Sequence, residues 1–327
     1  MRVLVTGATG NLGRSAVTRL IEEGHQVSVL TRRPFQAADL FGAGVSVHEW
    51  HPLSEAVPAE ALDSVDAVLH LMGAPLCGSQ SRDAAKDVVA SRIYSARGLA
   101  EALKRRQVRL VATSIAIAPA EAGPPVTEDL LPANATSSLE RDIRSYEAEL
   151  EAATGDGLSV AIVRLGLVAM RGGPLAALMA LARRGLCPNL KGALIPAIAR
   201  EDAVAMLAVR LPHRPLEGLI HGVAAVAGDG EALLAALRPH PPGGRFIAVP
   251  ISLLRRRLGL AAALLSCHRQ VVPQRLQAAG AAFAAPDPMP AFVDALTEIA
   301  DARTGAPAPF RAAENGKGDT APEPEAT

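Results

Sequence analysis

The sequence predicts an α/β fold, a doubly wound parallel sheet with a smaller region after it. Over the first two-thirds of the 327 residues, short β-branched runs alternate with helical segments. The runs are almost continuously apolar, as strands covered on both faces require. A glycine-rich turn joins the first run to the first helical segment. Strands linked through helices in this order make right-handed crossovers, so helices should cover both faces of the sheet.

The individual elements follow from these patterns in chain order. The apolar runs include "VLVT", "QVSVLT", "VSVHEW" and "DAVLHLM", and then "VRLVATS" and "LSVAIVRLG". Strands are therefore expected at 3–6, 26–31, 45–50, 66–72, 108–114 and 158–166. Helices are expected at 11–24, 81–106 and 138–153. His70, inside one of the apolar runs, is expected to be a core histidine with its polar atoms satisfied.

The C-terminal half has a less regular residue pattern. Glycine and proline recur at 172–174, 185–196 and 241–250. We therefore divide the chain into a sheet-forming domain at 1–166 and a smaller region at 167–302, packed on the sheet edge. Residues 303–327 are rich in Pro, Ala, Gly and charge, and are expected to form a disordered tail.

Composition narrows the function classes. Lys+Arg and Asp+Glu both number 33, so no charge excess points to nucleic acid or an anionic membrane. Three widely spaced cysteines give no disulfide or zinc framework, and the longest apolar stretch is too short to span a bilayer. The start of the chain has no signal-peptide pattern. A soluble cytoplasmic protein is expected.

The turn "VTGATGNLG" carries the clearest chemistry. Gly7 permits the tight turn, Gly10 lets the backbone approach a diphosphate, and Gly13 lets the helix pack close to the strand. The free N–H groups at the helix start would then face the phosphates. The residues expected to complete the coenzyme contacts here are Thr9, Asn11, Leu12 and Arg14. The alternative is a purely structural glycine turn.

The end of the second strand bears on coenzyme choice. Sites that prefer NAD place a carboxylate there, whereas this chain has Arg32 and Arg33. A guanidinium pairs with the 2′-phosphate of NADP, and Arg14 would assist. The prediction is NADP, with NAD as the alternative; solvated surface arginines are the competing interpretation.

Several motifs in order resemble one protein family. They include "VTGATGNLG", "VLTRRP", "DAVLHLMGAPL", "ASRIYSARGLAEAL", "VATSIAIA", "VRLGLV" and "AREDAV", spread over about 1–300. The chain resembles the extended short-chain dehydrogenase/reductase superfamily, within it the NAD-dependent epimerase/dehydratase group. It is similar there to the bacterial epimerase family proteins once labelled cell-division-inhibitor-like. The resemblance implies a Rossmann-type fold.

The resemblance also implies site residues. Gly73 would close the loop on the nicotinamide side, Ser114 would stand where the superfamily has its catalytic hydroxyl, and Leu165 would lie near the nicotinamide. The chain departs from the pattern after Ser114, where the tyrosine-containing stretch is replaced by "IAIAPAEAG", with Ala118 and Pro119.

Tyr146 is the second candidate for catalysis. The superfamily's tyrosine works with a lysine four residues later, and here that position is Leu150. Without a neighbouring cation a tyrosine, with its ordinary pKa of about 10, is a poor general base, although it can still donate a proton. Tyr146 is either that catalytic group or an aromatic that anchors the helix.

The leading hypothesis is an NADP-binding oxidoreductase or epimerase acting on a small carbonyl or hydroxyl substrate. The alternative is a non-catalytic dinucleotide-binding sensor or scaffold. The expected partner is a small molecule, not nucleic acid or membrane, and a homodimer is left open.

Overall fold

The computed structural model describes residues 1–73, 77, 82–118, 123–129, 138–155, 157–210, 212, 216–238 and 246–302. Pro119 and the expected tail at 303–327 lie outside the described residues. Along the parts described, no helix is both long and apolar enough to cross a bilayer.

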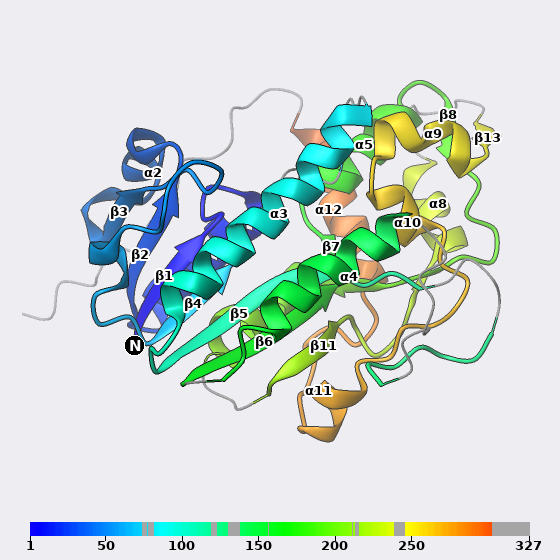
Figure 1. Ribbon diagram of the computed structural model, residues 1–327. Coiled ribbons are helices and arrows are strands. Elements are labelled where there is room, and N and C mark those ends of the chain that lie inside the picture. Colours follow the sequence, from blue (N-terminus) through cyan, green and yellow to red (C-terminus); the bar gives the residue numbers. More distant parts are fainter. Residues whose placement is uncertain are drawn as a thin grey trace, which may run out of the picture.

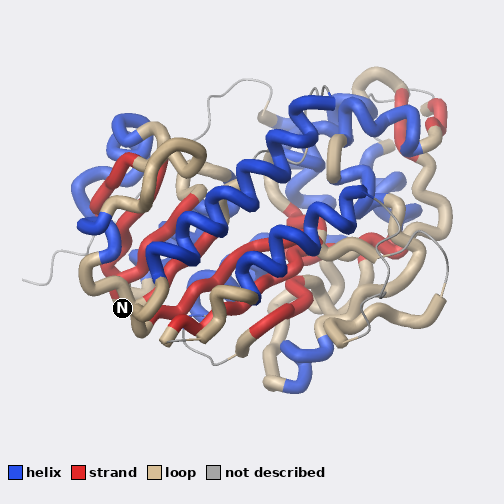
Figure 2. Tube along the Cα trace, viewed as in Figure 1, coloured by secondary structure: helices blue, strands red, loops and turns tan. Residues whose placement is uncertain are grey.

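A seven-stranded parallel sheet forms the centre of the molecule, with helices on both of its faces (Figures 1 and 2). The strand order is β11-β6-β5-β4-β1-β2-β3. The predicted doubly wound fold is therefore confirmed. The strands are β1 (Arg2–Thr6), β2 (Gln26–Thr31), β3 (Val45–Glu49), β4 (Ala67–His70), β5 (Val108–Ile115), β6 (Leu158–Leu165) and β11 (Gly218–Gly222).

The two faces of the sheet are covered by different helices. Long helices α3 (Arg82–Leu103) and α4 (Ser138–Glu151) run side by side across one face (Figure 1). The core between these helices and the sheet includes Leu99 of α3, Leu110 of β5 and Ile162 of β6, all fully buried. The other face carries α1 (Asn11–Glu22), α2 (Pro34–Phe41) and α6 (Arg200–Val204), which a π-helical stretch, Ala205–Arg210, prolongs. Burial on both faces explains why the strands read as continuous apolar runs.

A second apolar cluster lies at the carboxyl ends of β5 and β6. It joins Ile115 and Leu167 to helices from the C-terminal half of the chain (Figure 1). Its helices are α5 (Gly173–Ala182), α8 (Gly230–Leu237), α9 (Ile251–Leu258), α10 (Ala261–Leu265) and α12 (Met289–Asp301), and α11 (Gln274–Ala278) lies against β11. Short strand pairs complete the region: β7 (Leu167–Ala169) with β10 (Ala197–Ala199), β8 (Leu186–Pro188) with β13 (Ile247–Val249), and β9 (Leu194–Ile195) with β12 (Gly228–Asp229).

The boundary at residue 166 stays a prediction. The chain beyond it supplies the cluster described above, but it also returns to the central sheet, where β11 pairs with β6. Helix α2 and strand β11 were not anticipated from the sequence. Each is short, and β11 begins at Gly218, a residue type that weakens a strand signal.

Candidate functional site

The glycine turn is shaped by positions at which no side chain fits. Gly7 has a φ of 71°, in the left-handed region. A Cβ added there would lie 2.6 Å from the carbonyl carbon of Leu71. A Cβ added to Gly13 would overlap the carbonyl oxygen of Gly7, so only glycine lets α1 come this close to the turn. The turn itself is closed by the Gly10 N–H, which donates to the Gly7 carbonyl at 3.0 Å.

The amino end of α1 is open to an anion. Gly10 caps the helix with extended backbone, no side chain caps the first N–H groups, and the first turn has no acidic residue. Among the described residues other than its two chain neighbours, only the Gly7 carbonyl oxygen lies within 4 Å of a Cβ built on Gly10. The donors and the free space suit the diphosphate of a dinucleotide.

Two side chains from the first turn of α1 hold the loop in place. Arg14 donates from Nε to the Thr9 carbonyl at 2.9 Å, and is half-buried. Asn11 donates from Nδ2 to the Arg171 carbonyl at 3.0 Å, which ties the loop to the segment before α5. Arg14 therefore has a structural role in the loop, whatever it contacts in a bound coenzyme.

Arg32 and Arg33 directly follow β2, and both are exposed. The Arg33 N–H donates to Thr31 Oγ1 at 3.1 Å, which turns the chain into α2. The first carboxylate after β2 in the sequence is Asp39, inside that helix. The turn after β2 thus offers two cations, while Glu49 of the neighbouring strand β3 pairs in register with Thr31 and places a carboxylate close by.

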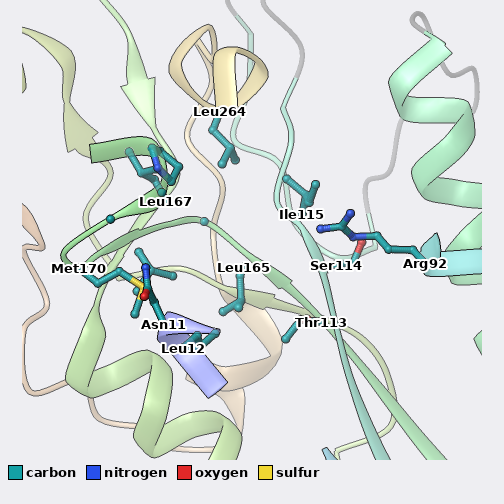
Figure 3. A pocket seen from close by; sticks show the side chains of 15 residues that line it. Asn11, Leu12, Arg92, Thr113, Ser114, Ile115, Leu165, Leu167, Met170 and Leu264 are labelled. Carbon is teal, nitrogen blue, oxygen red and sulfur yellow. The ribbon is translucent and has the colours of Figure 1, made fainter. Parts of the chain in front are cut away.

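A pocket of about 180 Å³ lies between the glycine loop and the carboxyl ends of β5 and β6 (Figure 3). Apolar side chains make most of its wall. Four polar side chains also face it. The lining residues with side chains other than glycine and proline are Asn11, Leu12, Arg92, Thr113, Ser114, Ile115, Leu165, Leu167, Val168, Met170 and Leu264. The structure thus brings together four of the predicted residues: Asn11, Leu12, Ser114 and Leu165.

Ser114 is fixed by a buried ion pair. Its hydroxyl donates to Glu147 Oε1 at 2.6 Å. Arg164 donates to both oxygens of the same carboxylate, from Nε to Oε1 at 2.7 Å and from Nη2 to Oε2 at 2.5 Å. Glu147 and Arg164 are only 3% and 6% exposed. Because a carboxylate paired with a guanidinium only accepts, the serine hydrogen is committed and its lone pairs remain available.

Strand register aligns this network across the sheet. Ser114 pairs with Arg164, and Arg164 pairs with His221 on β11. The His221 N–H donates to Glu128 Oε1 at 2.9 Å, and its ring Nδ1 lies 3.0 Å from the Val272 carbonyl. Burial lowers the pKa of His221, with the Glu128 charge opposing. Registered residues on parallel strands share a face, so these polar groups form one row under the helices.

Tyr146 lies outside the pocket. It is 2% exposed, packs in the cluster under α3 and α4, and donates its hydroxyl to the Thr113 carbonyl at 3.1 Å. Burial raises the pKa of Tyr146, although the nearby Arg92 charge lowers it. Leu150, one helical turn later, is fully buried in the same cluster. A catalytic part for Tyr146 stays a prediction; the geometry described is that of a packing residue.

Arg92 of α3 enters the pocket beside Gly73. A Cβ on Gly73 would lie 2.5 Å from the guanidinium carbon, so the glycine leaves room for this side chain. Burial lowers the pKa of Arg92. His70 lies at the end of β4. Both of its ring nitrogens are near hydroxyls: Thr6 Oγ1 at 2.7 Å and Ser95 Oγ at 3.3 Å. It is a satisfied core histidine, as expected.

The segment after Ser114 carries no hydroxyl as far as it is described. Ala118 is buried, and its N–H donates to Cys267 Sγ at 3.4 Å. Burial raises the pKa of the Cys267 thiol to about 11, so the sulfur is neutral at physiological pH.

Sequence reasoning missed the pocket role of Arg92 and the partner of Arg164. An arginine in the middle of "VAIVRLG", a strand predicted to be buried on both faces, was a usable signal. Such a charge needs a buried carboxylate, and a helix that packs on the sheet is the natural source.

The fold and the site define a doubly wound protein with a dinucleotide-type glycine loop. A sequence model described as the NAD dependent epimerase/dehydratase family matches residues 3–174, more than half of the chain. The chain belongs to this family. The assignment to the short-chain dehydrogenase/reductase superfamily is thereby confirmed, while the cell-division-inhibitor-like label stays a prediction.

Similar proteins span nearly the whole chain. Mouse epimerase family protein SDR39U1 is 29% identical over 90% of this chain and 100% of its own length. Epimerase family protein YfhF of Bacillus subtilis is 24% identical, covering 86% and 94%. The crystal structure of human SDR39U1 (isoform 2) with NADPH has a TM-score of 0.69 at 25% identity, covering 92% of this chain and 99% of that one.

Proposed function

We propose that this protein binds NADP and transfers hydride between the coenzyme and a small carbonyl or hydroxyl substrate. The observation that carries the proposal is the Cβ-excluding glycine turn opening directly onto a pocket at the carboxyl ends of the strands. In open α/β sheets, ligands bind in that crevice. The human SDR39U1 structure with NADPH supports the choice of coenzyme.

The glycine turn would hold the diphosphate. The contacts we assign to it come from the backbone of Gly7, Thr9, Gly10 and Gly13 and from the first turn of α1. Arg14 would hold the loop in place through its hydrogen bond to the Thr9 carbonyl. Gly73 and Leu165 would border the nicotinamide end, where Leu165 and Leu12 line the pocket.

Arg32 and Arg33 would select NADP over NAD. A charge-assisted hydrogen bond to the 2′-phosphate contributes about 1.5–3 kcal/mol, which corresponds to roughly tenfold to a hundredfold in affinity. Both arginines are exposed, so they are accessible to the phosphate and partly screened by solvent. The gain is expected towards the lower end of that range.

When bound, the coenzyme supplies the hydride, and the protein supplies position. Ser114 would contact the reacting oxygen from the pocket wall. Since its hydrogen is donated to Glu147, the serine oxygen would accept a hydrogen bond from a substrate hydroxyl. Arg164 keeps the carboxylate in place and thereby keeps the serine in this one orientation.

A non-catalytic sensor or scaffold is the second candidate, and one observation favours it. Among the described residues that line the pocket there is no tyrosine, lysine, histidine or acid. General acid–base catalysis uses a group whose pKa lies near the working pH, and the lining side chains offer none. Helix α4 contributes an apolar side chain near this wall, because Ile143 packs against the apolar cluster that contains Ile115 and Leu264.

The coenzyme assignment is tested by calorimetry with NADPH and NADH. Replacing both arginines, Arg32→Ala with Arg33→Ala, should weaken NADPH binding about tenfold or more and leave NADH almost unchanged. A matched control removes two exposed arginines from α9, Arg255→Ala with Arg257→Ala, and should change neither. Equal weakening of both coenzymes would refute selection by these arginines.

Catalysis is tested separately, by following NADPH formation from NADP over a panel of small alcohols and hydroxy acids, whose hydroxyl can donate to the Ser114 oxygen. NADPH formation that falls in Ser114→Ala, with NADPH affinity intact, supports the enzyme. Tight NADPH binding without turnover of any compound, and without any effect of Ser114→Ala, would support the sensor instead.

A further inference from the structure

The net charge of zero conceals a local excess of cations in the C-terminal half of the chain. From 232 to 286 the sequence contains arginines and no aspartate or glutamate; Glu231 and Asp287 bound this stretch. Within it the structure describes strand β13 and helix α9, and Arg255 and Arg257 of that helix are exposed. A balanced total charge is therefore compatible with a basic surface at this place in the fold.

Helix α9 has an inner and an outer face. On the inner face Leu254 and Leu258 are buried in the apolar cluster that also contains α5 and α10. On the outer face Leu253 is 72% exposed, and Arg257 stands one turn further along the same side. Packing within the fold accounts for the inner face only, so the outer face presents an aliphatic side chain among cations to the surroundings.

A second exposed aliphatic side chain lies on the strand before this helix. Ile247, the first residue of β13, is 66% exposed. In the β8–β13 pair, Ala248 is in register with Cys187. Burial raises the pKa of Cys187, and the charge of Arg238 acts in the opposite direction, which places Arg238, exposed at the end of α8, near this pair. Figure 1 shows β8, β13 and α9 together at one end of the molecule.

We infer that this end of the protein docks on a membrane surface with anionic headgroups. The docking patch consists of the side chains of Arg238, Ile247, Leu253, Arg255 and Arg257. The guanidinium groups would lie among the lipid phosphates, and the two aliphatic side chains would enter the boundary between headgroups and acyl chains. Such peripheral binding needs no membrane-spanning helix.

A lipid surface fits the docking patch better than a nucleic acid does. The most exposed apolar side chains of the patch are aliphatic, whereas single-stranded nucleic acid is bound by stacking on aromatic rings. A phosphate backbone offers no apolar volume to Leu253 and Ile247, but the acyl boundary of a membrane does. The inference goes beyond the proposed function and does not depend on it, because none of the patch residues lines the coenzyme-side pocket.

The test is sedimentation of the full chain with vesicles, made of phosphatidylcholine alone or of equal parts phosphatidylcholine and phosphatidylglycerol. The anionic vesicles should bind at least about tenfold more tightly, and added salt should weaken them. Each arginine at an anionic surface is worth about fivefold, so Arg255→Ala with Arg257→Ala should weaken binding about twentyfold. Equal binding of the two kinds of vesicle would overturn the inference.

Replacement of Leu253 separates a lipid surface from a purely electrostatic partner. Leu253→Asn removes the side chain that would enter the lipid, so vesicle binding should fall about tenfold. In Leu253→Trp the tryptophan emission should shift to the blue on anionic vesicles; the wild type, whose single tryptophan is the fully buried Trp50, should show no shift. If Leu253→Asn binds as the wild type does, or if duplex DNA binds more tightly than the vesicles, the inference is wrong.

Arg32→Ala with Arg33→Ala is the matched control. It also removes two exposed arginines, but next to α2, which lies at the opposite end of the molecule from α9 (Figure 1). Its vesicle binding should stay within about twofold of the wild type, because charges that far from the surface are screened. Equal losses in the two double variants would assign the binding to total charge and overturn the docking patch. Thermal unfolding checks that each variant is folded.

Discussion

The glycine loop and the substrate-side pocket are built on opposite principles. The loop is made of backbone: its shape depends on side chains that Gly7 and Gly13 lack. The pocket is made of side chains brought from β5, β6, β7, α1, α3, α10 and the segment before α5. The first is contained in nine consecutive residues, whereas the second exists only after the sheet has formed.

This difference decides which region tolerates change. The glycine turn fails when a side chain is added at Gly7 or Gly13, and its contacts with other elements are made by backbone, through Leu71 beside Gly7 and the Arg171 carbonyl that accepts from Asn11. The pocket is supported by a buried ion pair between Glu147 and Arg164, from two separate elements, and it fails when either partner is lost. Specific replacements in each region follow from this contrast.

The largest effect is expected from Glu147→Gln. The variant leaves Arg164 charged and buried without an anion, which costs about 3–5 kcal/mol of unfolding free energy. Denaturant unfolding of the purified protein measures it. Glu149→Gln is the matched control on the same helix, because its partner Arg97 is exposed; the expected cost there is about 0–1 kcal/mol.

A small loss in Glu147→Gln, equal to that of the control, would contradict the buried ion pair as the support of the pocket. The same variant also probes Ser114. With the amide in place of the carboxylate, the serine hydrogen is no longer drawn to an anion, so affinity for a hydroxyl substrate should fall with NADPH affinity unchanged.

A smaller effect, dependent on pH, is expected at His70, which joins the two regions through Thr6 of β1 and Ser95 of α3. Burial, and secondarily the Arg92 charge, lowers the pKa of His70 from 6.5 to about 3. On acidification the unfolded chain therefore takes up this proton first. The stabilisation is complete above pH 6.5 and is lost progressively towards about pH 3, by at most about 1.4 kcal/mol per pH unit.

The measurement is the free energy of unfolding at a series of pH values, for the wild type and for His70→Gln. His221 also has a lowered pKa and adds a slope of the same sign, so the difference between the two proteins isolates His70. Between pH 6.5 and pH 5 the wild type should lose about 2 kcal/mol more than the variant. Parallel curves would contradict a neutral, buried His70.

The backbone part of the molecule could be predicted from local patterns. Strands at 26–31 and at 158–166 were anticipated to within one residue, because an apolar run bounded by polar residues marks a covered strand. The glycine turn likewise has a local cause. Strand β11 was missed because its apolar content is low and its place in the sheet comes only from pairing with β6.

The side-chain part could not be read in the same way. Ser114 and Leu165 were placed in the site, but the register that sets Arg164 between Ser114 and His221 is a property of the assembled sheet. Arg92 lies in a helix with arginines around it, and nothing local distinguishes it from Arg97, which is exposed. Only packing against Gly73 turns one of them inward.

The smallest effect is expected from Tyr146→Phe, which distinguishes a packing role of Tyr146 from a catalytic one. The hydroxyl makes one hydrogen bond to the Thr113 carbonyl, so its removal should cost about 1 kcal/mol of unfolding free energy. Coenzyme affinity and turnover should stay near those of the wild type, because Tyr146 does not line the pocket. A catalytic proton donor would instead lose about a hundredfold or more in turnover.

Unfolding and turnover measured on the same preparation decide between these two roles. Leu150→Lys is a second test of the same two roles, since it would restore the spacing of the superfamily's tyrosine–lysine pair. Leu150 is fully buried in the same apolar cluster as Trp50 and Leu99, so the ammonium would be desolvated and the protein destabilised, with no gain in turnover. A gain in turnover would place Tyr146 at the reacting oxygen and make α4, rather than the strand ends, the catalytic side of the pocket.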